Sequence, residues 1–301
     1  MELKYLYTIR KILDTGSYQN AANALNYAQS TITFQVKQLE TELGIKIFEK
    51  KGMKMELTEE GKNVLPLIDQ VIEAADNLLS YKNAQDGISG TLKIALPETL
   101  VTYQLQPVLQ KFKELAPNVN LSIHVMNCFA IHEQMIGGNF DIAIHYNVGK
   151  YPKSITIKEI ETFPLILVGS PVLTTEEADF ITPKQTKSIC HIQNDANALY
   201  LKMFHHYLKK KNITLGAEME LWSIESVKRS VMSNLGVAYM PRFTVEDELA
   251  AGTLIELETD IENSTFTAIY AYNQNKWQSP AMQLFLDILE NYYETCEKPR
   301  I

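Results

Sequence analysis

The chain has 301 residues, of which 46% are hydrophobic and 21% charged, an ordinary globular composition with enough length for two or three domains. The formal net charge of -8 argues at first sight against a nucleic-acid partner. However, residues 1–60 carry 8 basic and 8 acidic residues, which leaves 20 basic and 28 acidic residues for the remainder. The first 60 residues are therefore neutral, and the excess of acid belongs to the rest of the chain.

Other features of the composition bear on the cellular compartment. The three cysteines are widely separated and lack a C-x-x-C spacing, so the sequence predicts neither a zinc site nor a disulfide framework. The N-terminus does not resemble a signal peptide, and no apolar run reaches about 18 residues. We expect a cytoplasmic protein that has no membrane partner and needs no metal or cofactor.

The first 58 residues predict three short helices followed by a β-ribbon. Apolar residues recur at helical spacing over 3–13, and Gly16 suits a C-terminal cap. A second helix is expected to begin at Ser17, and a third to run over about 28–43. The alternating segment IKIFEKKGMKMELT then predicts a hairpin or wing around Lys51-Gly52.

The third helix has an apolar face and a polar face. Two helices joined by a short turn, the second with this pattern, form a helix-turn-helix whose second helix enters the major groove of DNA. Amides and hydroxyls on the outward face, Gln35 among them, can pair with base edges or phosphates, and Gln29 in the first turn should reach deepest. The residues expected to contact DNA are Ser17, Gln29, Ser30, Thr31, Thr33, Phe34, Lys37, Lys50, Lys51 and Lys54.

A long helix is predicted to follow, with Thr58 as its N-cap. Its apolar residues repeat at alternating intervals of four and three, as in a coiled coil, at Val64, Ile68, Val71, Ala75 and Leu78. This stripe predicts either dimerisation through the helix or packing on the core of its own domain, and its length favours neither alternative. The polar segment 83–90 is expected to be a linker.

From residue 91 onward, strand and helix patterns alternate, which predicts an α/β fold class. The predicted elements exceed what one compact sheet needs, so we expect two similar subdomains with a cleft between them. Ligands in such folds bind at the carboxyl ends of strands, where helices begin. The strand TLKIAL, for example, runs into Pro97-Glu98-Thr99 and a helix.

A dense set of motifs lies within the first 61 residues. G-S-x-x-x-A-A-x-x-L begins at Gly16, Q-L-E-x-E-L-G begins at Gln38, and L-T-x-x-G ends at Gly61, with Phe48 between the last two. In these motifs the chain resembles LysR-type transcriptional regulators. The likeness continues, more weakly, through FDIAI, LGVAYMP and SPAMQLFLDIL, and so covers the whole chain.

The sequence departs from the pattern of that family at two places. Ala28-Gln29-Ser30-Thr31-Ile32-Thr33 replaces the usual S-Q-P-A-x-S, and Glu49 and Glu56 intervene among the lysines of the wing. DNA affinity should therefore depend on salt through only a few phosphate contacts per subunit. The polar helix face could also be merely solvated, and each wing lysine could be an ordinary solubilising residue, but the combined spacing favours DNA binding.

The resemblance implies an organisation for the whole molecule. We expect a homodimer formed through the long helix and a tetramer formed through the effector domains, bound to a pseudo-palindromic site in double-stranded promoter DNA and controlled by a small-molecule effector. The implied regions are a winged helix-turn-helix over 1–58, a linker helix and hinge over 59–90, and a periplasmic-binding-protein-like effector domain over 91–301, with lobe I at about 91–146 and 268–301 and lobe II at about 147–267.

The resemblance also implies where an effector binds. Thr99 matches a position where family members commonly place an effector-binding hydroxyl. Glu98 is unusual, because a carboxylate at a helix start satisfies the helix dipole and so disfavours anionic ligands. In the alternative interpretation, Glu98 points to solvent and only stabilises the helix. The expected effector contacts are Glu98, Thr99, Thr102, Asn127, Cys128, His145, Gln193, Asn194 and Ser223.

Three other functions compete with this one. An enzyme is not expected, because the six histidines are scattered, His205-His206 fits an exposed helix surface, and neither G-x-S-x-G nor a P-loop occurs. A redox sensor would use Cys128 and Cys190, but buried unreactive thiols fit better because no cationic cluster is near either one. The remaining rival is a cytoplasmic small-molecule-binding protein whose N-terminal helices serve dimerisation only.

Overall fold

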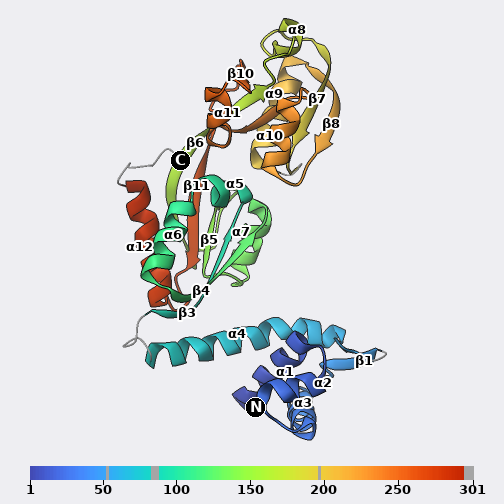
Figure 1. Cartoon of the computed structure of the whole chain (residues 1–301), viewed down its shortest axis with the longest axis vertical. Coiled ribbons are helices and arrows are strands. Elements are labelled where there is room, and N and C mark those ends of the chain that lie inside the picture. Colours follow the sequence, from blue (N-terminus) through green and yellow to red (C-terminus); the bar gives the residue numbers. More distant parts are fainter. Residues whose placement is uncertain (52–53, 83–87, 196–197, 295–301) are drawn as a thin grey trace. The chain divides into compact units, whose positions relative to one another are not determined.

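The computed structural model describes residues 1–51, 54–82, 88–195 and 198–294 (Figure 1). The chain divides into two compact units, Met1–Gly90 and Thr91–Ile301. Most of the predicted linker, the turn at Gly52 and the third cysteine, Cys296, lie outside the described residues. Among the helices described, none combines the length and the apolarity needed to cross a lipid bilayer.

The first unit begins with the predicted helix-turn-helix and ribbon, which are confirmed. Its elements are α1 (Leu3–Thr15), α2 (Tyr18–Leu25), α3 (Gln29–Leu43), β1 (Phe48–Lys51), β2 (Lys54–Leu57) and α4 (Glu59–Lys82). Gly16 ends α1 and Gly44 ends α3 with φ angles of 77° and 69°, a left-handed conformation that glycine adopts without strain. The core is apolar and includes Leu6, Ile9, Ala21, Ala22, Ile32, Val36 and Leu39.

Buried hydrogen bonds hold the ribbon against the helices. The carboxylate of Glu40 on α3 accepts hydrogen bonds from the backbone N–H of Ile47 at 2.8 Å and of Phe48 at 3.4 Å. Thr58 caps α4 as predicted, because its hydroxyl accepts a hydrogen bond from the backbone N–H of Gly61 at 2.9 Å. Its own N–H donates to the carbonyl of Ile47 at 3.0 Å, so α4 begins directly beside the strand β1.

The apolar residues of α4 lie in two different environments. Ile68 is buried in the core of the first unit, with Val64 packed beside it. Val71 and Leu78, in contrast, are 42% and 74% exposed. One face of α4 thus packs on its own domain, as one of the two alternatives predicted, and another face exposes apolar side chains.

The second unit contains a seven-stranded mixed sheet with the order β10-β6-β11-β5-β3-β4, in which β9 also pairs with β6. The long strand β6 runs antiparallel to β11 from the pair Ile155↔Asn273 to the pair Pro164↔Thr265, and both extend through the middle of this unit (Figure 1). The strands are β3 (Ser89–Leu96), β4 (Asn118–Val125), β5 (Ile142–Tyr146), β6 (Ile155–Gly169), β9 (Ala238–Pro241), β10 (Ile255–Leu257) and β11 (Thr265–Asn273).

Helices and a second small sheet complete two lobes at the two ends of these strands (Figure 1). The first lobe contains α5 (Glu98–Tyr103), α6 (Gln106–Leu115), α7 (Cys128–Ile136) and α12 (Pro280–Glu294). The second contains α8 (Thr175–Ala178), the parallel pair β7 (Thr186–Gln193) and β8 (Thr214–Glu220), α9 (Leu199–Lys211), α10 (Ile224–Met232), η1 (Arg242–Thr244) and α11 (Glu246–Ala250). The predicted two-lobed α/β architecture is confirmed.

Gly61 occupies a position where no side chain fits. A Cβ atom added there would lie 2.2 Å from the carbonyl oxygen of Ile47, which accepts a hydrogen bond from Thr58 and so cannot move freely. We expect Gly61→Ala to lower the free energy of unfolding of the first unit by roughly 1–3 kcal/mol, as overpacking does elsewhere. Chemical denaturation of the full chain, followed by circular dichroism, measures this change.

Gly149→Ala is a matched control, because an added Cβ there meets nothing within 4 Å. Its stability should change by less than roughly 0.5 kcal/mol. Wild-type stability in Gly61→Ala would contradict the steric argument.

Candidate nucleic-acid interface and ligand cavity

The start of α3 presents polar side chains to solvent. Gln29 and Ser30 are exposed in its first turn, where Ala28 offers no side chain to cap the helix. Lys37 is exposed further along, and the apolar ring of Phe34 is 59% exposed. Amide, hydroxyl, ammonium and aromatic groups thus share one accessible surface, as major-groove contacts require.

The two threonines of this surface are less accessible than the neighbouring residues that were also predicted to contact DNA. Thr31 and Thr33 are half-buried, and the hydroxyl of Thr33 donates to the carbonyl oxygen of Gln29 at 3.0 Å. That bond fixes the threonine side chain along the helix. Its methyl group and the free lone pairs of its oxygen stay available to a partner.

Gln35 does not face outward, and that prediction is wrong. It is only 3% exposed, and its Oε1 accepts a hydrogen bond of 2.5 Å from the hydroxyl of Thr8 on α1. Its position between the buried residues Ile32 and Leu39 places it on the inner face, where a polar side chain must be hydrogen-bonded. Gln35 therefore joins α1 to α3.

The remaining predicted DNA contacts lie on α2 and the ribbon. Ser17 is half-buried and accepts a hydrogen bond from the backbone N–H of Asn20 at 3.1 Å, which leaves its own O–H able to donate. Lys50 and Lys51 are exposed on β1, and Lys51 pairs with Glu56 at 3.2 Å. The side chain of Lys54 lies outside the described residues.

A cavity of about 470 Å³ lies within the second unit and takes side chains from both lobes. The first lobe contributes the start of α5, the turn between β4 and α7, and the end of β5. The second contributes the end of β7, the start of α9 and the segment after β8. The lining residues are Pro97, Glu98, Thr99, Val125, Met126, Asn127, Cys128, Phe129, Tyr146, Asn194, Asp195, Ala198, Leu199, Tyr200, Glu220 and Trp222.

The charged side chains described in the wall of this cavity are all negative. Among the described lining residues, the charged side chains are Glu98, Asp195 and Glu220, all of them acidic. Aromatic rings accompany them, including Tyr200 and the 96% exposed Trp222. Carboxylates with aromatic faces attract cations by direct charge and by cation–π interaction, and repel anions.

Glu98 connects the two lobes at the edge of the cavity. Its carboxylate accepts hydrogen bonds from the hydroxyl of Ser223 at 3.1 Å and from the backbone N–H of Ile224 at 3.2 Å, at the start of α10. The alternative in which Glu98 merely points to solvent is therefore wrong. A carboxylate beside the first N–H groups of a helix is favourable, so Glu98 stabilises contact between the lobes.

Paired hydroxyls and amides form the polar part of the wall. The hydroxyls of Thr99 and Tyr146 lie 2.5 Å apart, and Tyr200 donates to the Oδ1 of Asn194 at 2.8 Å. Asn127 caps α7 by accepting a hydrogen bond from the N–H of Ala130 at 2.9 Å. Burial raises the pKa of Tyr146 well above its usual value, so this hydroxyl stays protonated.

Four of the predicted effector contacts are not among the residues that line the cavity. Thr102 is exposed on α5, and Ser223 donates to Glu98. His145 is fully buried, where its ring nitrogens lie 2.7 Å from the carbonyl oxygen of Tyr146 and 2.7 Å from the hydroxyl of Tyr151. Gln193 is 6% exposed at the end of β7.

The lining residues that sequence reasoning missed are mostly aromatic or acidic. Tyr146 is not one of these, because a wall was expected at His145-Tyr146, where β5 ends; of this pair, only Tyr146 lines the cavity. Glu220 ends β8 and Trp222 follows it; the sequence TLGAEME alternates Leu215, Ala217 and Met219 with other residues, but this strand was not predicted. Tyr200 lies at the start of α9, where only the fold shows which side chains face the cavity.

The cysteine beside the cavity is poorly suited to redox chemistry. Burial raises the pKa of the Cys128 thiol to about 12, so it is protonated at neutral pH. The thiolate is the nucleophilic form, and a protonated thiol reacts slowly with peroxide. Burial also raises the pKa of Cys190. These environments favour the alternative in which both thiols are unreactive.

Comparison with known proteins identifies the family. Residues 3–62 match the model of bacterial regulatory helix-turn-helix proteins of the lysR family, and residues 85–294 match the LysR substrate binding domain. The chain belongs to the LysR family of transcriptional regulators, in which a helix-turn-helix DNA-binding domain precedes a substrate-binding domain. The predicted family and function are confirmed, and this is a family of regulators and not of enzymes.

Individual relatives are similar to this chain over nearly its full length. The HTH-type transcriptional regulator YfiE of Escherichia coli K12 is 35% identical over 97% of this chain and 99% of that protein. YwqM of Bacillus subtilis is 29% identical over 98% of this chain and 100% of that protein. The structure of full-length CbnR complexed with its target DNA has a TM-score of 0.65 at 18% identity, covering 97% of this chain and 100% of CbnR.

Proposed function

We propose that the chain binds promoter DNA in the cytoplasm as a homodimer and changes transcription when a cationic small molecule occupies the cavity between its lobes. The DNA surface is the exposed start of α3 together with Ser17 and the wing lysines, including Lys54. The effector contacts are Glu98, Thr99, Asn127, Cys128 and Asn194. The observation that carries the effector class is that every charged side chain among the described lining residues is acidic.

Base recognition is assigned to the amide and hydroxyl groups of α3. Gln29 and Ser30 are exposed and uncharged, and a glutamine can form two hydrogen bonds with adenine. Lys37, Lys50 and Lys51 supply phosphate contacts, which position the protein without reading sequence. CbnR, whose fold is similar, has been seen bound to its target DNA, which supports DNA binding by this architecture.

Dimerisation is assigned to the outward face of α4. Leu67, Val71 and Leu78 are 57%, 42% and 74% exposed on this helix. A helix that leaves an apolar stripe in water gains stability when a second copy covers it. We assign the linker and dimerisation role to residues 59–90 and the effector role to residues 91–301, whose lobes are expected to form the tetramer.

Ligand binding without catalysis fits the chemistry of the cavity wall. The Cys128 thiol is protonated, and the hydroxyl of Thr99 is bonded to that of Tyr146, 2.5 Å away. Besides burial, the nearby carboxylate of Asp195 raises the pKa of the Cys128 thiol further, and so does not activate it as a nucleophile. The rival function, a binding protein whose N-terminal helices only dimerise, predicts no preference among DNA fragments.

The first prediction from this proposal concerns base recognition. Gln29→Ala should relax base preference at one position of each half-site, with a loss of about 1–3 kcal/mol of discrimination, because one amide contact to a base is lost. Selection of bound sequences from a random DNA pool by the purified full-length protein measures this. The melting temperature should not change, because Gln29 is exposed.

The matched control is Gln35→Ala on the same helix. It should lower the melting temperature, because truncating this buried side chain removes its hydrogen bond to Thr8 and leaves a cavity, and it should leave the selected sequence unchanged. If the two variants exchanged these effects, or if wild type selected no sequence, the assignment of α3 to DNA would fail.

The second prediction concerns the charge of the effector. Benzylamine should bind the full-length protein more tightly than benzoate, which has a similar size and the opposite charge, in isothermal titration calorimetry. Glu220→Gln should weaken benzylamine binding by about threefold, because a partly solvated ion pair contributes roughly 0.5–1 kcal/mol. Glu133→Gln, exposed on α7 and not a lining residue, is the control. Tighter binding of benzoate would refute the proposed effector class.

The third prediction concerns assembly. Leu78→Glu should convert the protein to smaller species in sedimentation velocity runs, because it places a charge within the apolar stripe of α4. Gln70→Glu adds the same charge at an exposed polar position of that helix and should leave the assembly unchanged. Wild-type sedimentation of the Leu78 variant would mean that another surface joins the subunits.

A further inference from the structure

Three side chains that can bind a metal ion converge in the second lobe, and none of them lines the ligand cavity. They are His191 on β7, His205 on α9 and Glu218 on β8, and one donor atom from each lies within 4.8 Å of the others. The parallel register pairs His191 directly with Glu218, so both side chains leave the same face of the sheet. The Nε2 of His205 lies 3.9 Å from the Oε1 of Glu218.

His191 is the unusual member of this cluster. It is only 1% exposed, and neither of its ring nitrogens has a hydrogen-bond partner among the described residues. Its ring packs against Phe204, with centroids 4.9 Å apart, and faces His205, with centroids 5.5 Å apart. Buried polar groups in native proteins are nearly always paired, so an unpaired imidazole aimed at two other donors calls for a ligand.

We propose that His191, His205 and Glu218 form a binding site for a zinc ion. Two imidazole nitrogens and one carboxylate oxygen are a donor set that zinc accepts, with solvent as the fourth ligand. Tetrahedral coordination at about 2.0–2.1 Å brings donor atoms to within roughly 3.3 Å of one another. The side chains of His205 and Glu218 are 42% and 64% exposed and can close this distance by rotation, while buried His191 stays fixed.

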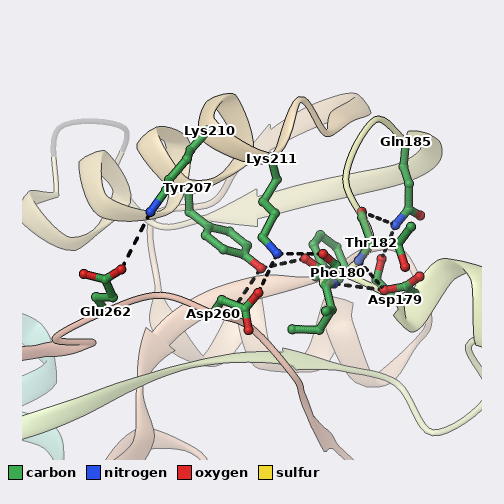
Figure 2. A network of polar contacts seen from close by, with 10 residues as sticks. Asp179, Phe180, Thr182, Gln185, Tyr207, Lys210, Lys211, Asp260 and Glu262 are labelled. Atoms are coloured by element: carbon green, nitrogen blue, oxygen red, sulfur yellow. Dashed lines mark hydrogen bonds and ion pairs between the residues drawn. The ribbon is translucent and has the colours of Figure 1, made fainter.

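The helix that carries His205 is firmly held. Tyr207 donates to the carbonyl oxygen of Phe180 at 2.6 Å and accepts from the backbone N–H of Asp260 at 3.1 Å, and Lys211 donates to the carbonyl oxygen of Ile181 at 2.7 Å (Figure 2). These contacts fix the C-terminal half of α9 against two loops. A donor on an anchored helix loses little freedom when it binds an ion.

A zinc ion at this site would connect three segments that also build one wall of the ligand cavity. β7 leads into Asn194, β8 ends at Glu220, and α9 begins at Leu199, all of which line the cavity. Zinc would hold these segments together a few residues from that wall. This consequence rests on the proposed function of the cavity, whereas zinc binding itself does not depend on it.

The test uses the full-length protein purified without a histidine tag and stripped with a chelator. Zinc is titrated in competition with a chromophoric chelator. Wild type should bind one zinc ion per chain at micromolar or lower concentration, and the melting temperature should rise with zinc. His205→Gln and Glu218→Gln should each lower the affinity by more than about tenfold, because even loss of a residue that only orients a ligand costs that much.

His206→Gln is the matched control, because the neighbouring histidine is exposed on the same helix and lies outside the cluster. It should bind zinc like wild type. X-ray absorption of the zinc complex should show nitrogen and oxygen ligands without sulfur. Equal affinity in wild type, His205→Gln and Glu218→Gln, absence of binding at micromolar zinc, or a sulfur ligand from a cysteine would each overturn the proposal.

Discussion

The antiparallel pairing of β6 with β11 is the constraint on which the second unit depends. β11 pairs with β5 on its other side, and β6 pairs with β9 and β10 toward its far end. The same two strands thereby supply the sheet of the first lobe and the sheet of the second (Figure 1). Because both lobes grow from one pair of strands, these strands bring the edges of the lobes to face one another. The ligand cavity occupies the space between these edges.

Under the proposed function, Glu98 is the residue through which the cavity would sense its occupant. The carboxylate lines the cavity and also receives hydrogen bonds from Ser223 and Ile224 of the opposite lobe. Nearby, the hydroxyl of Tyr103 on α5 donates to Glu225 on α10, and the buried amine of Lys228 donates to Tyr103 at 3.2 Å. A cation beside Glu98 would share the charge that now stabilises α10. Ligand binding and contact between the lobes therefore draw on the same carboxylate, which is the differential interaction that a switch requires.

Local signals were sufficient to predict much of the fold. Ser17 and Thr58 cap helices as their side chains suggest, and the pattern over about 28–43 predicted α3, which is observed at Gln29–Leu43. Signals that depend on tertiary contacts were misinterpreted. Gln35 is polar and was placed outside, but its partner Thr8 lies on another helix and could not be seen in the sequence. Of the two roles predicted for the stripe on α4, packing on the domain's own core accounts for only part of it.

The sites were less predictable than the fold because they, too, depend on tertiary contacts. Glu98, Thr99, Asn127, Cys128 and Asn194 line the cavity and lie where strands end and helices begin, which a sequence shows. Glu220 and Trp222 lie at the end of β8, a short strand that was not predicted, so their positions at the cavity could not be inferred. His191, His205 and Glu218 are far apart in the chain, and only the pairing of β7 with β8 and the packing of α9 bring them together.

In the proposed function, a cation between the lobes alters how the N-terminal unit engages DNA. Footprinting of the wild-type protein on the DNA upstream of its own gene, with a set of primary amines and the carboxylates of matching shape, measures this effect. At least one amine should change the protected region or its hypersensitive positions, while the matching carboxylate should leave both unaltered. A footprint that no amine changes, or that only carboxylates change, would contradict the proposed function.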